Sequence, residues 1–376
     1  MAQYKTLVDK VSIPPNMKTK QKDYESQGTL AIVDQGKKLI GGYTNNAEMA
    51  LQCKLPVIVF GDHTCAVKFV NFPFGAGADG IKVLSPKNGI LPKYLFYGTQ
   101  YLTLRFPDKG YARHYQHIEK MDLPVPSIET QQNIVSSIEE LFSELDKGVE
   151  TLQTIKEQLA VYRQAVLKEA LNGIKGQPYT VKDVCKEIKV GIVIKPSQYY
   201  TDEQVGIKAF RSANVREFHV EDKNWAYLSI AGHQANARSI VHTGDILIVR
   251  SGYPGTACVV PEQFNGCNAI DILIAVPNRD LVLPEFLCAY TNSPLGKKFV
   301  NEKKRGVGQK HFNVSGYSKM LISVPSLDKQ EEIVKKIASR LSVCDSIERT
   351  VNTALAQAEA MRQSILKKAF EGELCK

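Results

Sequence analysis

Apolar residues recur every seven positions in two long, proline-free stretches of the chain. In the first stretch one row contains Ile138, Leu145, Leu152, Leu159 and Val166, and a second contains Leu141, Ile155 and Tyr162, interrupted by Gly148. In the second stretch the corresponding rows are Ile337, Cys344, Val351, Ala358, Ile365 and Ile347, Ala354, Met361. This period is typical of a coiled-coil seam. It predicts two helices of about 44 residues, each roughly 65 Å long.

The two stretches complement each other in side-chain size, because the first has large residues where the second has Cys344, Ala354 and Ala358. We therefore expect antiparallel packing of the two helices, although separate docking of each helix on a globular domain would also bury these rows. The residues expected to carry helix–helix packing are Ile138, Leu145, Leu152, Leu159, Val166, Ile337, Val351, Met361 and Ile365.

The sequence of each long helix and of the residues before it occurs twice in the chain, at an offset of 199 residues. RQAVLKEALNG begins at residue 163 and RQSILKKAFEG at residue 362, while KMDLPVPSIETQQNIV at 120–135 matches KMLISVPSLDKQEEIV at 319–334. Ser127 and Ser326 are suited to cap the helix starts, and Gly173 and Gly372 to end them. An ungapped internal repeat of this length predicts two related halves.

A globular segment rich in short strand-like runs precedes each helix. Runs such as LPVIVFGDHTCAVKFV and GDILIVRSGYPGTACVV are broken by Gly, Pro and Asn, and each segment then has a helix-like piece opening with Leu-Pro. We expect mixed α/β (α+β) domains at residues 1–125 and 177–324, and spacer helices within 126–176 and 325–376. Antiparallel helices would relate the halves by a pseudo-twofold axis.

Composition narrows the functional classes. The 376 residues are 43% apolar and 23% charged, as in folded soluble proteins. No membrane-length apolar run and no signal peptide are evident, which favours a cytoplasmic protein. The eight scattered cysteines lack zinc-ligand spacing, so no metal site is expected. The net charge of +9 permits a polyanionic partner.

Two similar domains held at a fixed spacing are suited to reading two similar features at a fixed spacing. Double-stranded DNA offers such features, and the expected helix length is near two duplex turns of about 34–36 Å each. A coiled-coil adaptor whose two domains bind proteins, without DNA specificity, is the alternative. Salt separates the two hypotheses, because DNA binding weakens steeply as counterions compete.

At this point the whole chain resembles the specificity (S) subunit of type I restriction-modification systems. The repeated P-S-x-x-x-Q-x-x-I-V and R-Q-x-x-L-K-x-A-x-x-G blocks are similar to that family's conserved regions, and GDILIVRSGYPG at 244–255 is similar to a stretch of its target recognition domains. The resemblance implies that each domain reads half of a bipartite DNA target. It also implies that the helices set the spacing and dock two methyltransferase (M) subunits.

The same resemblance implies a non-catalytic chain within a complex that defends against foreign DNA. The S-adenosylmethionine site would lie in the M subunits, and ATP and Mg would serve the restriction (R) subunits. The chain itself would hold no cofactor. Because the two recognition domains diverge, no base contact can be carried over by position.

Candidate DNA-binding residues cluster in polar and basic loops. The basic stretch KKRGVGQKHF contains Lys304, Arg305, Gln309, Lys310 and His311, and its counterpart contains Arg113 and His114 after Arg105. Arg and Lys neutralise phosphates, and Gln can read adenine. The second domain also offers Arg211, Asn214, Arg216, Arg250, Ser251 and Tyr253, and the first offers Asn45, Asn46, His63 and Thr64. Solvated loops, plain turns and, for Arg250, pairing with an internal acid are the alternatives.

Three patterns that could suggest catalysis are better explained otherwise. FGAGADG fits a dinucleotide fingerprint, but IKVLSP after it predicts a strand where that site needs a helix. Asp183 and Glu187 have the wrong spacing for a nuclease metal pair. Asp62 and His63 lack a recognisable nucleophile, and the Asn/Asp-Pro-Pro-aromatic motif of an adenine methyltransferase is absent.

Overall fold

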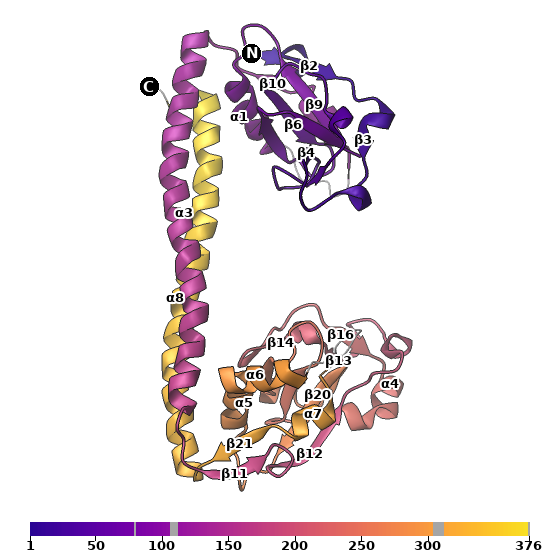
Figure 1. Cartoon of the computed structure of the whole chain (residues 1–376), viewed down its shortest axis with the longest axis vertical. Helices are drawn as coiled ribbons and strands as arrows, with labels where there is room; N and C mark the ends of the chain where they lie inside the picture. The colour runs from indigo at the N-terminus through magenta and orange to yellow at the C-terminus, as the bar shows by residue number, and fades with distance from the viewer. Residues whose placement is uncertain (79, 106–111, 304–311, 375–376) are drawn as a thin grey trace. The chain divides into compact units, whose positions relative to one another are not determined.

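The computed structural model describes residues 1–78, 80–105, 112–303 and 312–374 (Figure 1). The chain divides into two compact units, residues 1–153 with 352–376 (unit 1) and residues 154–351 (unit 2). Two long helices, α3 (Ile128–Leu171) and α8 (Leu327–Glu371), each contribute to both units. No helix among the described residues is long and apolar enough to cross a membrane.

Unit 1 contains two four-stranded sheets and a short terminal strand pair. The first sheet is antiparallel, in the order β2 (Val8–Val11), β9 (Ile81–Pro86), β6 (Val57–Gly61) and β7 (Val67–Val70). The second has the order β3 (Lys18–Thr19), β8 (Phe74–Gly77), β4 (Leu30–Val33) and β5 (Gly42–Thr44). The other elements are β1 (Ala2–Gln3), α1 (Pro92–Thr103), α2 (Tyr115–Ile118) and β10 (Asp122–Leu123), which pairs with β1.

Unit 2 repeats this plan. Its four-stranded antiparallel sheet has the order β12 (Cys185–Val190), β20 (Ile272–Pro277), β17 (Ile246–Val249) and β18 (Ala257–Val259). Its second sheet has the order β16 (Ala226–Leu228), β13 (Ile207–Phe210) and β19 (Asn268–Ala269). Strand β11 (Gln177–Thr180) pairs with β21 (Leu321–Val324), as β1 pairs with β10. The strand order therefore extends the repeat into the globular parts, where the sequences diverge.

Unit 2 adds a hairpin and several short helices. The hairpin consists of β14 (Val215–Arg216) and β15 (His219–Val220). The helices are α4 (Ile230–Ala235), α5 (Pro284–Asn292), α6 (Pro294–Lys303) and α7 (Val314–Ser318). Helix α5 begins with Leu-Pro in the same way as α1, so the predicted helix-like pieces and the mixed α/β class are confirmed.

A fully buried glutamine joins each long helix to its globular part. Gln131 Nε2 donates to the carbonyls of Gly89 at 2.9 Å and Pro126 at 3.0 Å, and Gln131 Oε1 accepts the amide of Leu91 at 2.9 Å. Its repeat counterpart Gln330 makes the equivalent three bonds, to Leu281, Pro325 and Leu283. Each amide thus satisfies backbone groups on both the helix start and the turn before α1 or α5, which would otherwise be buried without partners.

The ends of the long helices agree with the sequence punctuation. Ser127 Oγ accepts the amide of Thr130 at 3.2 Å, which caps the start of α3. Gly173 and Gly372 follow the two helices with φ of +68° and +81°, the left-handed conformation that favours glycine.

The first predicted seven-residue row is the buried one. Ile138, Leu159, Val166, Ile337, Cys344 and Val351 are buried, and Leu145, Leu152, Ala358 and Ile365 are partly buried. The second predicted row differs, because Leu141, Tyr162, Ile347 and Met361 are 40–54% exposed. Met361 therefore lies outside the buried seam to which the sequence assigned it.

The inner row next to the seam lies four residues after the first row, not three. Phe142 and Leu341 occupy it and are buried. Phe142 packs edge-on against Tyr97 of α1, at a ring centroid distance of 5.8 Å, and Leu341 belongs to the core of unit 2. Each helix therefore turns toward its own globular part as well as toward the other helix. A strict coiled-coil interpretation overlooked that second demand on the helix face.

Ion pairs between α3 and α8 recur at repeat-related positions. In unit 2, Arg163 pairs with Asp345 at 2.6 Å, and Glu169 pairs with Arg340, also at 2.6 Å. Moving forward along α3 therefore moves backward along α8, so the helices are antiparallel there. In unit 1, Arg362 pairs with Asp146, which is the same contact with the two copies exchanged.

The glutamine bonds generate a stability prediction. Gln131→Leu keeps the side-chain volume close to the original but leaves two carbonyls and one amide without partners. We therefore expect the free energy of unfolding to fall by about 2–4 kcal/mol. Chemical denaturation followed by circular dichroism measures this change. Gln132→Leu is the matched control because Gln132 is exposed, and equal effects of the two substitutions would contradict the role of Gln131.

Candidate nucleic-acid interface

In unit 1, the turn after the inner strand β6 binds residues 112–115, which belong to the first of the two predicted basic stretches. Asp62 is buried; its Oδ1 accepts the amide of Tyr115 at 2.9 Å, and its backbone carbonyl accepts the amide of His114 at 2.8 Å. His63 Nδ1 lies 3.0 Å from the carbonyl oxygen of Ala112. The structure therefore brings His63 beside exposed Arg113, although the two are fifty residues apart in the chain.

A second loop joins this turn, and the sequence reasoning missed it. Thr64 Oγ1 donates to the carbonyl of Gln35 at 2.5 Å, in the segment between β4 and β5. Gly80 has φ of +71°, and a Cβ there would lie 2.5 Å from Gln35 Oε1, so the loops meet closely. Lys37 and Lys38 are exposed on this segment. The adjacent glycine and two lysines of DQGKKLIG, between two strand-like runs, were the available signal.

Lys68 differs from these exposed lysines. Its ammonium donates to the Asp34 carbonyl at 2.7 Å and lies 3.3 Å from Asp34 Oδ1, and its side chain is almost fully buried. Burial lowers the pKa of Lys68, while Asp34 opposes that shift. Lys68 therefore holds the base of the 34–41 segment and is not available to a phosphate.

In unit 2, Arg250 binds the backbone at the end of the second basic stretch, as Asp62 does in the first, although its charge is opposite. Arg250 follows the central strand β17, and its backbone carbonyl accepts the amide of Phe312 at 3.1 Å. Its Nε donates to the Phe312 carbonyl at 3.1 Å, and Nη1 pairs with Asp271 at 2.5 Å. The sequence left open whether Arg250 contacts DNA or pairs with an acid of its own domain. In the structure it pairs with Asp271.

The turn after Arg250 presents an aromatic side chain to solvent. Tyr253 is 85% exposed, and Ser251 beside it is partly buried. Gly255 ends the turn with φ of +88°, and a Cβ there would lie 3.0 Å from Val300 of α6. The turn is therefore backed by a buried helix face and leaves Tyr253 projecting.

The segment that leads into hairpin β14–β15, together with its first strand, contains both internal and surface residues. Asn214 is fully buried: its Oδ1 accepts the amide of Arg211, and its Nδ2 donates to Lys223 at 2.8 Å and Glu221 at 3.1 Å. Its amide shapes the turn and does not reach the surface. Arg211 donates to the Asn224 carbonyl, and exposed Arg216 donates to its neighbour Val215 at 3.1 Å.

The remaining candidates in unit 1 also divide between surface and interior. Asn45 donates to Glu25 at 2.7 Å, and Asn46 caps a short turn by accepting the amide of Glu48 at 3.0 Å, as the plain-turn alternative predicts. His114 is buried, and Arg105 is exposed with its guanidinium 5.5 Å from the Tyr101 ring. Lys304, Arg305, Gln309, Lys310 and His311 lie outside the described residues.

The glycine-rich FGAGADG segment joins two strands. It begins as β8 and leads into β9, so the helix that a dinucleotide site requires does not follow it. Among the described residues, no group of three His, Cys, Asp or Glu side chains could hold a metal ion.

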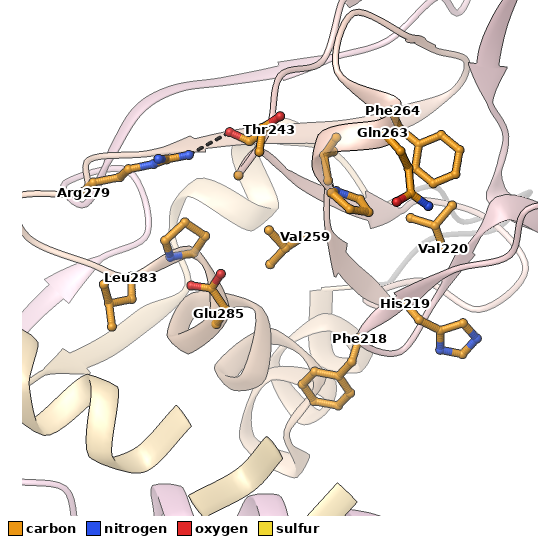
Figure 2. Close-up of a pocket in the computed structure, with 14 residues that line it drawn as sticks. Phe218, His219, Val220, Thr243, Val259, Gln263, Phe264, Arg279, Leu283 and Glu285 are labelled. Carbon is orange, nitrogen blue, oxygen red and sulfur yellow. Dashed lines mark hydrogen bonds between the residues drawn. The ribbon is translucent and has the colours of Figure 1, made fainter. Parts of the chain in front are cut away.

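A groove of about 740 Å³ lies in unit 2 between the hairpin, β18 and the start of α5 (Figure 2). Its walls include Phe218, Val259 and Leu283. Arg279 donates to the Thr243 carbonyl at 2.7 Å and is therefore held by the backbone at the rim. The groove lies apart from Arg250 and Tyr253, neither of which lines it.

The comparisons agree with this duplicated arrangement. The family model of the type I restriction modification DNA specificity domain matches the chain twice, at residues 10–159 and 174–357. The chain belongs to this family. The resemblance expected from the repeated sequence blocks is confirmed.

Several specificity subunits are similar to this chain. Those of the type I enzymes EcoBI, from Escherichia coli, and EcoKI, from Escherichia coli strain K12, are each 27% identical over 67% and 68% of it. The chain spans 58% of the length of each of these two relatives. The StySPI specificity subunit of Salmonella potsdam is 22% identical over 97% of this chain and 79% of its own length.

A solved structure shares the fold. It comes from work on complex assembly and conformational transition of the type I R-M system, and its chain superposes with a TM-score of 0.66 at 17% identity. The superposition covers 99% of this chain and 97% of that chain. The likeness therefore extends over both globular parts and both long helices of this chain.

The contrast between Arg250 and Tyr253 generates the second prediction. Arg250→Ala removes a largely buried guanidinium, its ion pair with the partly exposed Asp271 and a backbone bond, so we expect a loss of about 1–2 kcal/mol in unfolding free energy. On the expectation from the sequence that Tyr253 contacts DNA, Tyr253→Ala should change stability by less than about 0.5 kcal/mol but weaken duplex binding roughly fivefold or more, because exposed aromatic side chains often dominate interfaces. Thermal unfolding and a duplex-binding titration measure both. A destabilised Tyr253 variant with unchanged binding would contradict this assignment.

Proposed function

We propose that this chain is the DNA-recognising specificity subunit of a type I restriction-modification complex and is itself non-catalytic. Each globular part reads one half of a bipartite double-stranded target. The observation that carries the proposal is that the DNA specificity domain occurs twice and that both copies place a polar turn in the same position. In both copies this turn follows the central strand and binds the segment returning from a basic stretch.

The exposed residues around these turns are chemically suited to DNA. In unit 1, Lys37, Lys38 and Arg113 place positive charge near His63 and Thr64. Such charges neutralise phosphates and give affinity without sequence information. In unit 2, Arg216 and Tyr253 are exposed and Arg211 is partly buried, and the predicted basic stretch 304–311 follows α6 in the sequence. Base contacts would come from the polar side chains between these cations.

The long helices would set the distance between half-sites and dock two M subunits. The repeat-related pairs Arg163–Asp345 and Arg362–Asp146 support a fixed register between the helices. Their outer faces expose Leu141, Val161, Tyr162, Val343, Ile347 and Met361, an unusual amount of apolar surface for a solvated helix. We propose that the M subunits cover these faces. The S-adenosylmethionine site would then lie in the M subunits, and ATP and Mg would act in R subunits.

The proposal predicts a bipartite methylation motif. Expression with a cognate methyltransferase subunit, followed by single-molecule sequencing for modified adenine, should show two short specific blocks around a fixed run of unread bases. Two independent readers on a rigid spacer have this consequence, whereas one continuous reader does not.

Two other outcomes would contradict the proposal. A continuous motif would remove the spacer role of the helices. No methylation, together with no salt-sensitive affinity for duplex DNA, would favour the protein-adaptor alternative, because DNA binding that relies on phosphate contacts must weaken as salt rises.

Lengthening both helices together should lengthen the unread run. Thr154 and Thr353 are repeat counterparts, and four extra residues after each would add about 6 Å to each helix. We expect the motif to keep both specific blocks and to gain about one to two unread base pairs. Four residues inserted in the exposed bend at Ser26 and Gln27 form the control, with no expected change in spacing. An unchanged spacing in the helix variant would exclude the helices as the spacer.

A further inference from the structure

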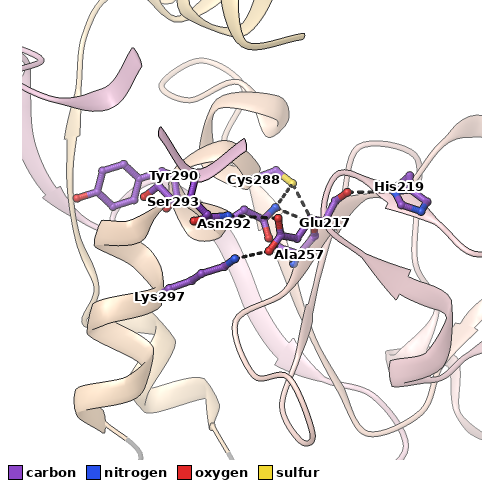
Figure 3. Close-up of polar contacts among 9 residues, drawn as sticks. Glu217, His219, Ala257, Cys288, Tyr290, Asn292, Ser293 and Lys297 are labelled. Carbon is purple, nitrogen blue, oxygen red and sulfur yellow. Dashed lines mark hydrogen bonds and ion pairs between the residues drawn. The ribbon is translucent and has the colours of Figure 1, made fainter. Parts of the chain in front are cut away.

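A polar contact in unit 2 joins its hairpin to two helices, and Figure 3 shows the part of it between Glu217 and Lys297. Glu217 and Phe218 form the turn between β14 and β15, where Phe218 has φ of +67°. The Glu217 carboxylate forms an ion pair with Lys297 of α6. It also accepts a hydrogen bond from Gln164 Nε2 of α3 at 3.4 Å. One side chain therefore links the hairpin, α6 and the long helix.

The hairpin is also fixed to the sheet through its backbone. The Phe218 amide donates to the Ala257 carbonyl at 3.0 Å, and Asn292 of α5 holds both backbone groups of Ala257, at 3.0 and 2.8 Å. Arg216 and His219, a cross-strand pair, flank the turn. Any tilt of the turn at Glu217 would therefore move these two side chains together.

Helix α6 lies between this hairpin and the exposed turn that contains Tyr253. Lys297 reaches Glu217, and Val300, one turn later, is fully buried beside Gly255. Residues three apart lie on the same side of a helix. The position of α6 therefore fixes how the hairpin and the Tyr253 turn lie relative to each other.

The repeat shows that this link is a feature of one half. Gln363, the repeat counterpart of Gln164, donates to Glu359 of its own helix at 3.5 Å. The segment between β4 and β5, which corresponds to the hairpin, uses Asp34 to bind Lys68 of strand β7. In the described part of unit 1, the recorded polar contacts thus attach this segment to a sheet and not to the long helix.

We infer that Glu217 is a positioning residue for the DNA half-site read by unit 2. It sets the hairpin bearing Arg216 and His219, and through α6 the turn bearing Tyr253, against the long helix. This inference rests on the proposed function. The Glu217–Lys297 pair is about one-third exposed on both sides, and such pairs contribute little to global stability. The expected consequence of its loss is altered recognition and not unfolding.

The test uses the assembled methyltransferase complex and its target as defined by methylation sequencing. Methylation rates are measured on duplexes with single base changes in each half of the target. For Glu217→Ala we expect a loss of about threefold to tenfold on the correct target, with relaxed base preference in one half and an unchanged melting temperature. Exchange of residues 177–318 identifies independently which half belongs to unit 2.

Two variants sharpen the test. Glu217→Lys combined with Lys297→Glu reverses the ion pair and should restore the methylation rate to within about twofold of the wild-type rate. If Glu217 acted through some other contact, reversing this pair would not restore the rate. Glu262→Ala makes the same charge change at an exposed site and should have no effect. A Glu217→Ala variant that weakens both halves equally, or neither, or is not rescued by reversal would overturn the inference. A wild-type complex without a bipartite motif would instead overturn the proposed function, and this inference with it.

Discussion

The structure depends on a buried amide at the start of each long helix. A helix that leaves a globular domain must place its first turn against that domain, and the backbone groups at the junction must then find partners away from water. Gln131 and Gln330 each supply two donors and one acceptor at this point, to the helix start and to the turn before α1 or α5. A shorter or apolar side chain would bury the same surface but leave those groups unpaired. This requirement gives a physical reason for finding glutamine in both copies, although the globular sequences have diverged.

Around that junction, the two halves reach the same geometry with different chemistry. In unit 1, Tyr4 lies 2.6 Å from Thr99 through its hydroxyl, and in unit 2, Tyr317 lies 2.8 Å from Thr291. Tyr4 comes from the start of its unit and Tyr317 from α7, near the end. The tyrosine that bonds the threonine of α1 or α5 is therefore supplied by different parts of the chain in the two halves. Burial raises the pKa of both phenols, which keeps them neutral as hydrogen-bonding groups. Asp62 and Arg250 show the same freedom with opposite charges.

Much of the frame could be predicted from the sequence, because periodicity and punctuation are local properties. The two helices, their ends at Gly173 and Gly372, and the Leu-Pro starts of α1 and α5 all follow from nearby residues. The second seam row could not, because Phe142 faces Tyr97 of α1, and the period does not record which face a distant helix will cover. The candidate interface was harder still. The sequence left Arg250 open between a DNA contact and an internal ion pair, and only the fold brings Asp271 and Phe312 beside it. Gln35 reaches Thr64 through a contact between loops.

These contacts divide the molecule into a frame, made of the junctions and the long helices, which is alike in both halves, and a surface of turns and a hairpin, which differs between them. The glutamine bonds and the pairs Arg163–Asp345 and Arg362–Asp146 recur at the repeat offset, so the junctions and the helix register are built in the same way in both halves. The turns after β6 and β17 follow equivalent strands of the two sheets but carry different residues, which would allow the proposed recognition to change without disturbing the frame. Glu217 lies where these two demands meet, because it belongs to a variable hairpin and yet contacts a helix of the frame. In the proposed recognition, Glu217 therefore couples the hairpin to the long helix, whereas the polar contacts of Asp34, in the described part of unit 1, attach the corresponding segment to its own sheet.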